Sequence, residues 1–200
     1  MGTRHLIAVK IDGEYKVAQY GQWDGYLSGH GVKILRFLNS RHKKYERFKN
    51  RVRKCSFYTE ADFELIDSKI NDRGFMNVEW SDVPVKWQHV YPQLDRDLCS
   101  RILSFVAGTK NKEIKLRNSI KFSCEIGCDY AYVIDFDTHT FEVFVSPHHK
   151  KYTDTSRFMP YYDESNRFSR YPMVLFKKFD LNNLPSPKEF LKLDEELYED

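Results

Sequence analysis

The chain has 200 residues, of which 41% are hydrophobic, 16% aromatic and 30% charged, and its 32 Lys and Arg against 29 Asp and Glu give a net charge of +3. A chain of this length and aromatic content can bury a core of its own, so it needs no disulfides or structural metal and is not expected to be disordered. It has no run of about 20 apolar residues and no secretory leader, so we expect one cytoplasmic domain over residues 1–200 with no membrane partner.

The first predicted element is a β-hairpin. The run from His5 to Ile11 is apolar and rich in β-branched residues, Asp12-Gly13 supplies a two-residue turn, and residues 14–20 alternate toward a second strand. Asp-Gly between two such runs is typical of a tight hairpin. Because both faces of the first strand are apolar, we expect it to lie centrally in its sheet.

Helical spacing of apolar residues predicts a helix from Val32 through residue 52 and a helix that follows Pro92 and ends at Gly108. Capping signals predict a short helix over 59–69, which begins at Thr59, and a C-terminal helix from Ser186. We assign no element to residues 71–91 beyond a loop.

Two further strands, Tyr130–Phe136 and Thr140–Val145, read as a second hairpin, and another apolar strand is predicted over 171–179. Residues 146–170 are polar and aromatic without a period, which predicts a mobile loop. Hairpins without a regular strand-helix-strand alternation indicate an α+β fold, with a mainly antiparallel sheet and about four helices packed against it.

The net charge hides a basic stripe, which we define as residues 41–54. It contains eight basic residues and one acid, Glu46. Such a stripe on a mildly acidic remainder is typical of a surface that meets nucleic acid or an anionic ligand. A solvated helix face explains it equally well, so both interpretations stay open.

Four cysteines are expected to be free thiols: Cys55, Cys99, Cys124 and Cys128. Three residues separate the last two, and the histidines that follow them, His139, His148 and His149, are irregularly spaced. This pattern fits common zinc and redox motifs poorly. The sequence therefore predicts no particular metal ligand and no cofactor, and it leaves open whether a metal participates.

The most unusual stretch is YGQWDGYLSGHG, residues 20–31, which we call the Gly-rich corner. Backbone N–H groups at Gly29 and Gly31 could approach a phosphate at the start of the following helix. Trp23 and Tyr26 could stack on a base, while the amide of Gln22 and the carboxylate of Asp24 read its polar edge. Tyr20 is expected to line the same pocket. In the structural alternative, Trp23 fills the core and the glycines only make a tight turn.

Three further residues, of which His30 belongs to the corner itself, also allow two interpretations. Arg4 could bind phosphate or carboxylate, or it could pair with Asp24 to fix the corner. Glu125 could be a second acid in the same pocket or a surface residue. His30 could donate to an anion or lie in solvent. The sequence has no Walker loop, no Gly-x-Ser-x-Gly elbow and no His-Glu-x-x-His helix.

Several of these residues form a recognisable pattern: Thr3-Arg4, a short hairpin, Tyr20, Trp23-Asp24-Gly25-Tyr26 and Gly29-x-Gly31. The pattern resembles a widespread family of small proteins from bacteriophages and prophages, and residues 125–143 look like the later segment of that family. Leu27 stands where the family usually has Pro, and Gln22 stands where it often has His. The resemblance implies a phage gene expressed in a bacterial cytoplasm.

Phage proteins of this size often counter host immunity, so the resemblance favours a protein that binds a nucleotide-derived signal, such as a cyclic dinucleotide or a cyclic ADP-ribose variant. The protein would sequester or hydrolyse that ligand. In hydrolysis, Asp24 would act as acid or base and Gln22 would orient water or substrate.

Two alternatives are kept. One is a nucleic-acid or protein interaction module that uses the basic stripe. The other is an amidohydrolase with an N-terminal nucleophile at Thr3, which would require removal of two residues. The sequence leaves open whether the chain forms a homo-oligomer.

Overall fold

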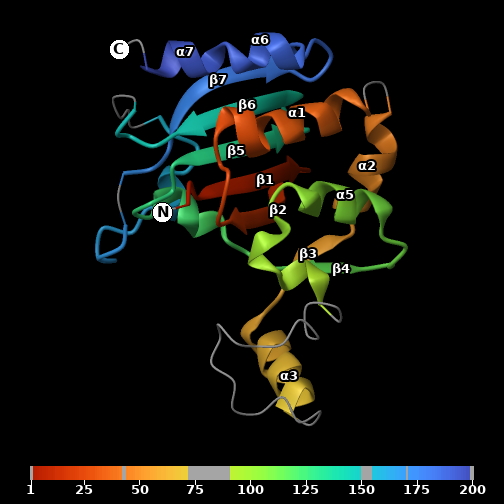
Figure 1. Ribbon diagram of the computed structural model, residues 1–200. Coiled ribbons are helices and arrows are strands. Elements are labelled where there is room, and N and C mark those ends of the chain that lie inside the picture. Colours follow the sequence, from red (N-terminus) through yellow and green to blue (C-terminus); the bar gives the residue numbers. More distant parts are fainter. Residues whose placement is uncertain (1, 42–43, 72–90, 150–154, 170, 199–200) are drawn as a thin grey trace.

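The computed structural model describes residues 2–41, 44–71, 91–149, 155–169 and 171–198 (Figure 1). Its centre is a five-stranded sheet with the order β2-β1-β5-β6-β7. Helices cover one face of this sheet, and the irregular segments after residue 117 cover the other. The α+β class and the mainly antiparallel sheet are therefore confirmed.

The N-terminal hairpin is formed as expected, by β1 (His5–Ile11) and β2 (Glu14–Gly21). Asp12 and Gly13 both have positive φ, 54° and 82°, as a tight turn that matches the twist of the strands requires. β1 is central in the sheet, because β2 pairs with one of its edges and β5 with the other.

The second hairpin is also confirmed, as β5 (Tyr130–Asp135) and β6 (Thr140–Val145), and β7 (Val174–Asp180) pairs with β6. The pairing of β1 with β5 is parallel, which the sequence does not predict. A small parallel sheet of β3 (Cys55–Phe57) and β4 (Ile114–Leu116) is likewise unpredicted. Both pairings join segments far apart in the chain, so no local pattern could reveal them.

The single helix predicted over 32–52 is wrong, because the chain forms α1 (Val32–Asn39) and then α2 (Tyr45–Val52). Ile34 and Leu38 are buried on α1, and Tyr45, Phe48 and Val52 are buried on α2, so the apolar residues fall on two helix axes. Lys44, with φ −126°, lies outside helical geometry immediately before α2. The break lets each short helix turn its own apolar side toward the sheet.

The helix predicted over 92–108 is also wrong in its first half. That half consists of two 3₁₀ turns, η2 (Pro92–Leu94) and η3 (Arg96–Leu98), and α5 begins only at Arg101 and ends at Gly108. Asp95 is extended, and Cys99 has φ 46°. Neither conformation fits an α-helix.

The two capped helices begin where expected. Thr59 and Asp62 exchange hydrogen bonds at the start of α3 (Glu60–Asn71), and Ser186 caps α6 (Pro187–Leu191), which α7 (Leu193–Tyr198) follows. The loop predicted over 71–91 falls almost wholly outside the described residues.

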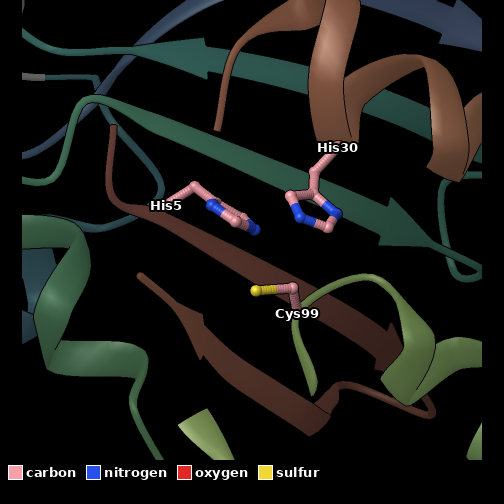
Figure 2. Close-up of side chains that lie close together, drawn as sticks. All are labelled: His5, His30 and Cys99. Carbon is pink, nitrogen blue, oxygen red and sulfur yellow. The ribbon is translucent and has the colours of Figure 1, made fainter. Parts of the chain in front are cut away.

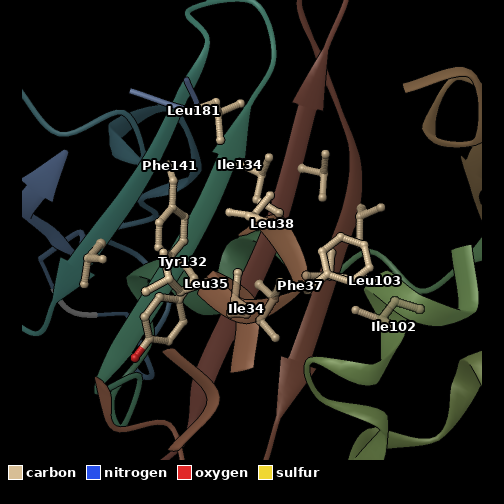
Figure 3. Close-up of a cluster of buried hydrophobic side chains, with 14 of the residues drawn as sticks. Ile34, Leu35, Phe37, Leu38, Ile102, Leu103, Tyr132, Ile134, Phe141 and Leu181 are labelled. Carbon is tan, nitrogen blue, oxygen red and sulfur yellow. The ribbon is translucent and has the colours of Figure 1, made fainter. Parts of the chain in front are cut away.

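Two apolar cores lie on the two faces of the sheet. Figure 3 shows the larger one, between the sheet and the helices, where Ile34, Leu35 and Leu38 of α1 pack over Tyr132 and Phe141.

The smaller core lies on the opposite face and contains Phe158, which is fully buried against Phe144. Phe158 anchors the segment expected as a mobile loop. Apart from the 3₁₀ turn η5 (Met159–Tyr161), the described part of that segment is irregular, and its mobility stays a prediction. Within the described chain, no helix has the length and apolar character that a membrane span requires.

Candidate functional site

The Gly-rich corner is held firmly against the start of β1. The N–H of Gly25 donates to the carbonyl of Thr3 at 2.9 Å, and the N–H of His30 donates to the carbonyl of Asp24 at 2.8 Å. The buried hydroxyl of Tyr132 donates to the carbonyl of Gly25 at 2.7 Å. Asp24 takes a positive φ of 54° to make this turn.

The glycines of the corner allow close packing within the protein. A Cβ at Gly21 would lie 2.2 Å from the ring of His5, and one at Gly29 would lie 2.2 Å from the carbonyl oxygen of Asp24. A Cβ at Gly31 would lie 2.8 Å from the hydroxyl of Tyr132. This geometry accounts for all three glycines as packing residues, and phosphate contacts at Gly29 and Gly31 stay a prediction.

The corner wraps around a buried cluster of His5, His30 and Cys99. Figure 2 shows the two imidazole rings and the thiol converging from three segments: β1, the end of the corner and the turn before α5. One nitrogen of each ring and the sulfur lie within 4.8 Å of one another. The two rings stack with their centroids 4.7 Å apart. Among the described residues this is the group whose donor atoms could hold a metal ion.

Burial keeps all three groups of the cluster uncharged. It lowers the pKa of His5 to about 3, helped by the neighbouring His30, and it lowers the pKa of His30 to about 4. Burial also raises the pKa of the Cys99 thiol, although hydrogen bonds with the backbone of Trp23 and Gln22 partly lower it. At neutral pH the cluster therefore consists of two neutral imidazoles and a thiol.

The aromatic residues of the corner lie on the surface. Trp23 is 49% exposed and Tyr26 is 47% exposed, so the alternative in which Trp23 fills the core is wrong. Asp24 is also exposed. Gln22 is half-buried, and its side-chain oxygen accepts a hydrogen bond from the hydroxyl of Tyr20. These positions leave Trp23 and Tyr26 accessible to a ligand.

A separate pocket of about 680 Å³ brings together three of the predicted ligand residues, Arg4, Tyr20 and Glu125. We call it the basic pocket. Gln19, the neighbour of Tyr20, also lines it. The other lining residues come from segments that the sequence did not connect: Gln93, Leu94, Arg96, Arg117, Asn118, Ser119, Ile120, Lys121, Phe122 and Tyr161.

Four cations and one carboxylate, that of Glu125, line the basic pocket. Of the cations, Arg4, Arg117 and Lys121 make no ion pair within the described residues, and Arg96 makes an exposed contact of 3.9 Å with Asp97. Cations without a protein counter-ion attract anions into a concave site.

Arg4 reaches the pocket because of its neighbours. Gly127 lies so close to its guanidinium that a Cβ there would be 1.6 Å from a terminal nitrogen. The backbone N–H of Arg4 donates to the carboxylate of Asp129 at 3.0 Å. Within the described residues Arg4 forms no ion pair with Asp24, so the interpretation of Arg4 as the partner that fixes the corner is wrong.

The basic stripe is partly occupied by contacts within the protein. Lys49 pairs with Glu46 at 2.9 Å, Arg53 pairs with Asp12 at 2.8 Å, and Arg51 donates to the carbonyl of Asn111. Three other cations of the stripe, Arg41, Lys44 and Arg47, line a second hollow of about 450 Å³ with Phe48 and α5.

Sequence reasoning missed His5 and Cys99 as partners of His30, and it missed Arg96, Arg117 and Lys121 as partners of Arg4. Each group is assembled by contacts across the fold, and only the concentration of unusual residues in the corner pointed to one of them. Comparisons of the chain with protein-family models, with curated proteins and with solved structures found no match. The interpretation of both sites therefore depends on the residues of this chain.

Proposed function

We propose that the protein binds a small, anionic, nucleotide-derived molecule in the basic pocket. The observation that carries the proposal is the convergence of Arg4, Arg96, Arg117 and Lys121 on one hollow of about 680 Å³. Its volume falls in the range of roughly 300–1,000 Å³ typical of small-molecule sites. Guanidinium groups are well suited to phosphate, because their N–H groups can bind two oxygens at once.

The pocket also offers what a base would need. Tyr20 and Phe122 meet edge to face with their ring centroids 4.8 Å apart, and Tyr161 lines the same hollow. Aromatic side chains commonly bind bases by stacking. The amides of Gln93 and Asn118 supply donors and acceptors for a polar edge. Phosphate binding and base binding are thus available in one site.

The geometry of the basic pocket favours binding of the ligand over its hydrolysis. Asp24 does not line the pocket, and the carboxylate there is that of Glu125. Catalysis by Asp24 and Gln22 stays a prediction of the sequence. The same holds for a counter-defence role of a phage protein in a bacterial host, where binding would remove a signalling molecule from the cell.

The test measures binding of cyclic dinucleotides and cyclic ADP-ribose isomers by calorimetry. The pocket variant Arg117→Gln/Lys121→Gln removes two cations that make no ion pair within the described residues, and the control Lys44→Gln/Arg47→Gln removes the same charge from the basic stripe. Because a hydrogen bond to a charged group contributes about 1.5–3 kcal/mol, we expect the pocket variant to weaken binding at least tenfold and the control to bind normally. Equal losses in both variants, or no binding by the unmodified protein, would overturn the proposal.

Recovery of the ligand after binding distinguishes sequestration from hydrolysis. After heat denaturation of the complex, chromatography should return the ligand intact if the protein sequesters it. A cleaved ligand from the unmodified protein and an intact one from Asp24→Ala would instead support hydrolysis.

The alternative function is nucleic-acid binding by the basic stripe, and it can be tested separately. An electrophoretic shift on DNA or RNA that weakens steeply with salt, and that is lost in Lys44→Gln/Arg47→Gln, would favour that alternative.

A further inference from the structure

His5 is a buried polar side chain without a partner. It has no solvent exposure, and both of its ring nitrogens lack a hydrogen bond. A buried polar group that is left unpaired costs about 1–3 kcal/mol, and native proteins rarely keep one without a reason. Gly21 makes room for the ring on one side, and its other neighbours include His30 and Tyr132. The fold thus encloses an imidazole ring whose two nitrogens have no hydrogen-bond partner in the protein.

The donors that surround His5 are those of a zinc site. His30 contributes a second imidazole and Cys99 contributes a sulfur, all within 4.8 Å of one another (Figure 2). Imidazole nitrogen and thiolate sulfur are preferred ligands of Zn²⁺, whereas Mg²⁺ and Ca²⁺ prefer oxygen. We propose that His5, His30 and Cys99 bind a Zn²⁺ ion, with the fourth position open to water or another small ligand.

The outer contacts of His30 fit this role. Nδ1 of His30 lies 2.7 Å from the hydroxyl oxygen of Ser100. With the proton on Nδ1, the ring donates to Ser100 and leaves its Nε2 lone pair for the metal. Metal-binding histidines almost always have such a second partner, which sets the tautomer and orients the ring. Ser100 directly follows Cys99, so one turn supplies both a ligand and the group that orients another.

The distances require only a small adjustment. With Zn–N bonds of about 2.0–2.1 Å and a Zn–S bond of about 2.3 Å, tetrahedral ligand atoms lie about 3.3–3.7 Å apart. The three donors, now within 4.8 Å, would draw together by about an ångström. A rotation of the Cys99 side chain supplies such a movement. It would exchange the sulfur's contacts with the carbonyl of Arg96, at 3.8 Å, and with the backbone of Gln22 and Trp23 for the Zn–S bond.

Binding would release one proton for each metal ion. The thiol of Cys99 loses its proton to solvent as the Zn–S bond forms, and the two imidazoles are already neutral. No oxidant or reductant takes part. The ion would join the start of β1, the end of the Gly-rich corner and the turn before α5 into one unit.

The test titrates chelator-treated, tag-free protein with Zn²⁺ and with Co²⁺ as a spectroscopic substitute. We expect one ion per chain, one proton released, a sulfur-to-cobalt charge-transfer band and a higher Tm with Zn²⁺. Cys99→Ala should lose the band, whereas Cys55→Ala, the same change at a buried thiol outside the cluster, should keep it. Absence of stoichiometric binding, or survival of the band in Cys99→Ala, would overturn the proposal.

A second pair of variants tests the ligands without removing the thiol. His5→Leu should weaken Co²⁺ binding more strongly than Ser100→Ala, for which the loss of an outer partner predicts roughly 10–100-fold. Circular dichroism of each variant in chelator checks that it is folded. A folded His5→Leu variant with unchanged affinity would place the metal elsewhere and contradict the assignment.

Discussion

Two buried polar clusters lie at opposite ends of the β1–β5 strand pair and on opposite faces of the sheet. At one end Asp135 and Glu142 are both paired with Arg157, at 2.5 and 3.3 Å, and Lys178 lies 3.5 Å from Glu142. At the other end the ring of His5 has no hydrogen-bond partner.

The two clusters differ in whether their buried polar groups find hydrogen-bond or ion-pair partners within the protein. A buried polar group that finds its partners in the protein is a part of the architecture, and the fold depends on it. Both ring nitrogens of His5 lack such a partner, and the metal ion proposed above would supply one. The comparison can be tested by removing one side chain at a time from each cluster.

The largest effect is expected for Arg157→Leu. This change leaves the carboxylates of Asp135 and Glu142 buried without their main counter-ion, which typically costs about 3–5 kcal/mol. Urea unfolding measures the loss. Arg167→Leu, the same substitution at an exposed arginine, is the control and should change the free energy of unfolding by less than about 0.5 kcal/mol. Similar losses in both variants would remove the distinction between the two clusters.

A smaller, pH-dependent effect is expected for Asp135→Asn. Burial opposes ionisation of Asp135, but the hydrogen bond from Arg157 and those from the backbone of Thr138 and Asp137 hold its pKa below the usual value. Because this pKa is lowered by folding, the charge stabilises the protein above the unfolded pKa of about 3.9, and the contribution is lost as the pH falls toward the folded pKa.

The variant should therefore be about 1–3 kcal/mol less stable than the unmodified protein at pH 7. The asparagine oxygen can still accept from the backbone of Asp137 and Thr138, so the turn is retained. Urea unfolding over a pH series should show the gap closing below about pH 4. A gap that persists unchanged at lower pH would mean that the carboxylate charge is not what stabilises this end of the sheet.

The smallest effect is expected for His5→Leu in metal-free protein. The change removes two nitrogens that have no partner and keeps an apolar side chain of similar size, so stability should change by about 1 kcal/mol or less in either direction. Thermal unfolding in chelator measures it.

Tyr132→Phe provides the contrast on the same face of the sheet. It removes a partnered hydroxyl and leaves the carbonyl of Gly25 unpaired, which should cost about 1–1.5 kcal/mol. If His5→Leu costs clearly more than Tyr132→Phe, His5 is a structural residue and the contrast between the two clusters fails.

Local patterns in the sequence were sufficient for the strands of the two hairpins and for β7, but not for β3 and β4. The Asp12-Gly13 turn, the caps at Thr59 and Ser186 and the two hairpins follow from neighbouring residues alone. Errors occurred where a backbone conformation interrupted a regular pattern, as at Lys44 and Cys99. Helical spacing continues across both positions, so periodicity could not reveal the breaks.

The candidate sites were less predictable, because distant segments build them. Arg4, Tyr20 and Glu125 line the basic pocket, whereas Trp23, Asp24 and Tyr26, which the sequence places in the same site, do not, and Arg117 joins the pocket only through the fold. His5 looked like the first residue of a strand, and Cys99 like one of four free thiols. Gly21 and Gly25 both lie against His5, and a Cβ at Gly21 would displace its ring, but nothing in the sequence connects these glycines with His5.

The parallel pairing of β1 with β5 has a consequence for synthesis of the chain. β1 is complete by residue 11, but the strand that covers its second edge begins at Tyr130. Until that segment leaves the ribosome, the first hairpin exposes an apolar strand with unpaired backbone groups, which is the kind of edge that aggregates. Closure of the sheet thus waits for more than half of the protein, and high contact order of this kind slows folding. We therefore expect chains that end before residue 130 to be insoluble, even though they contain the whole Gly-rich corner.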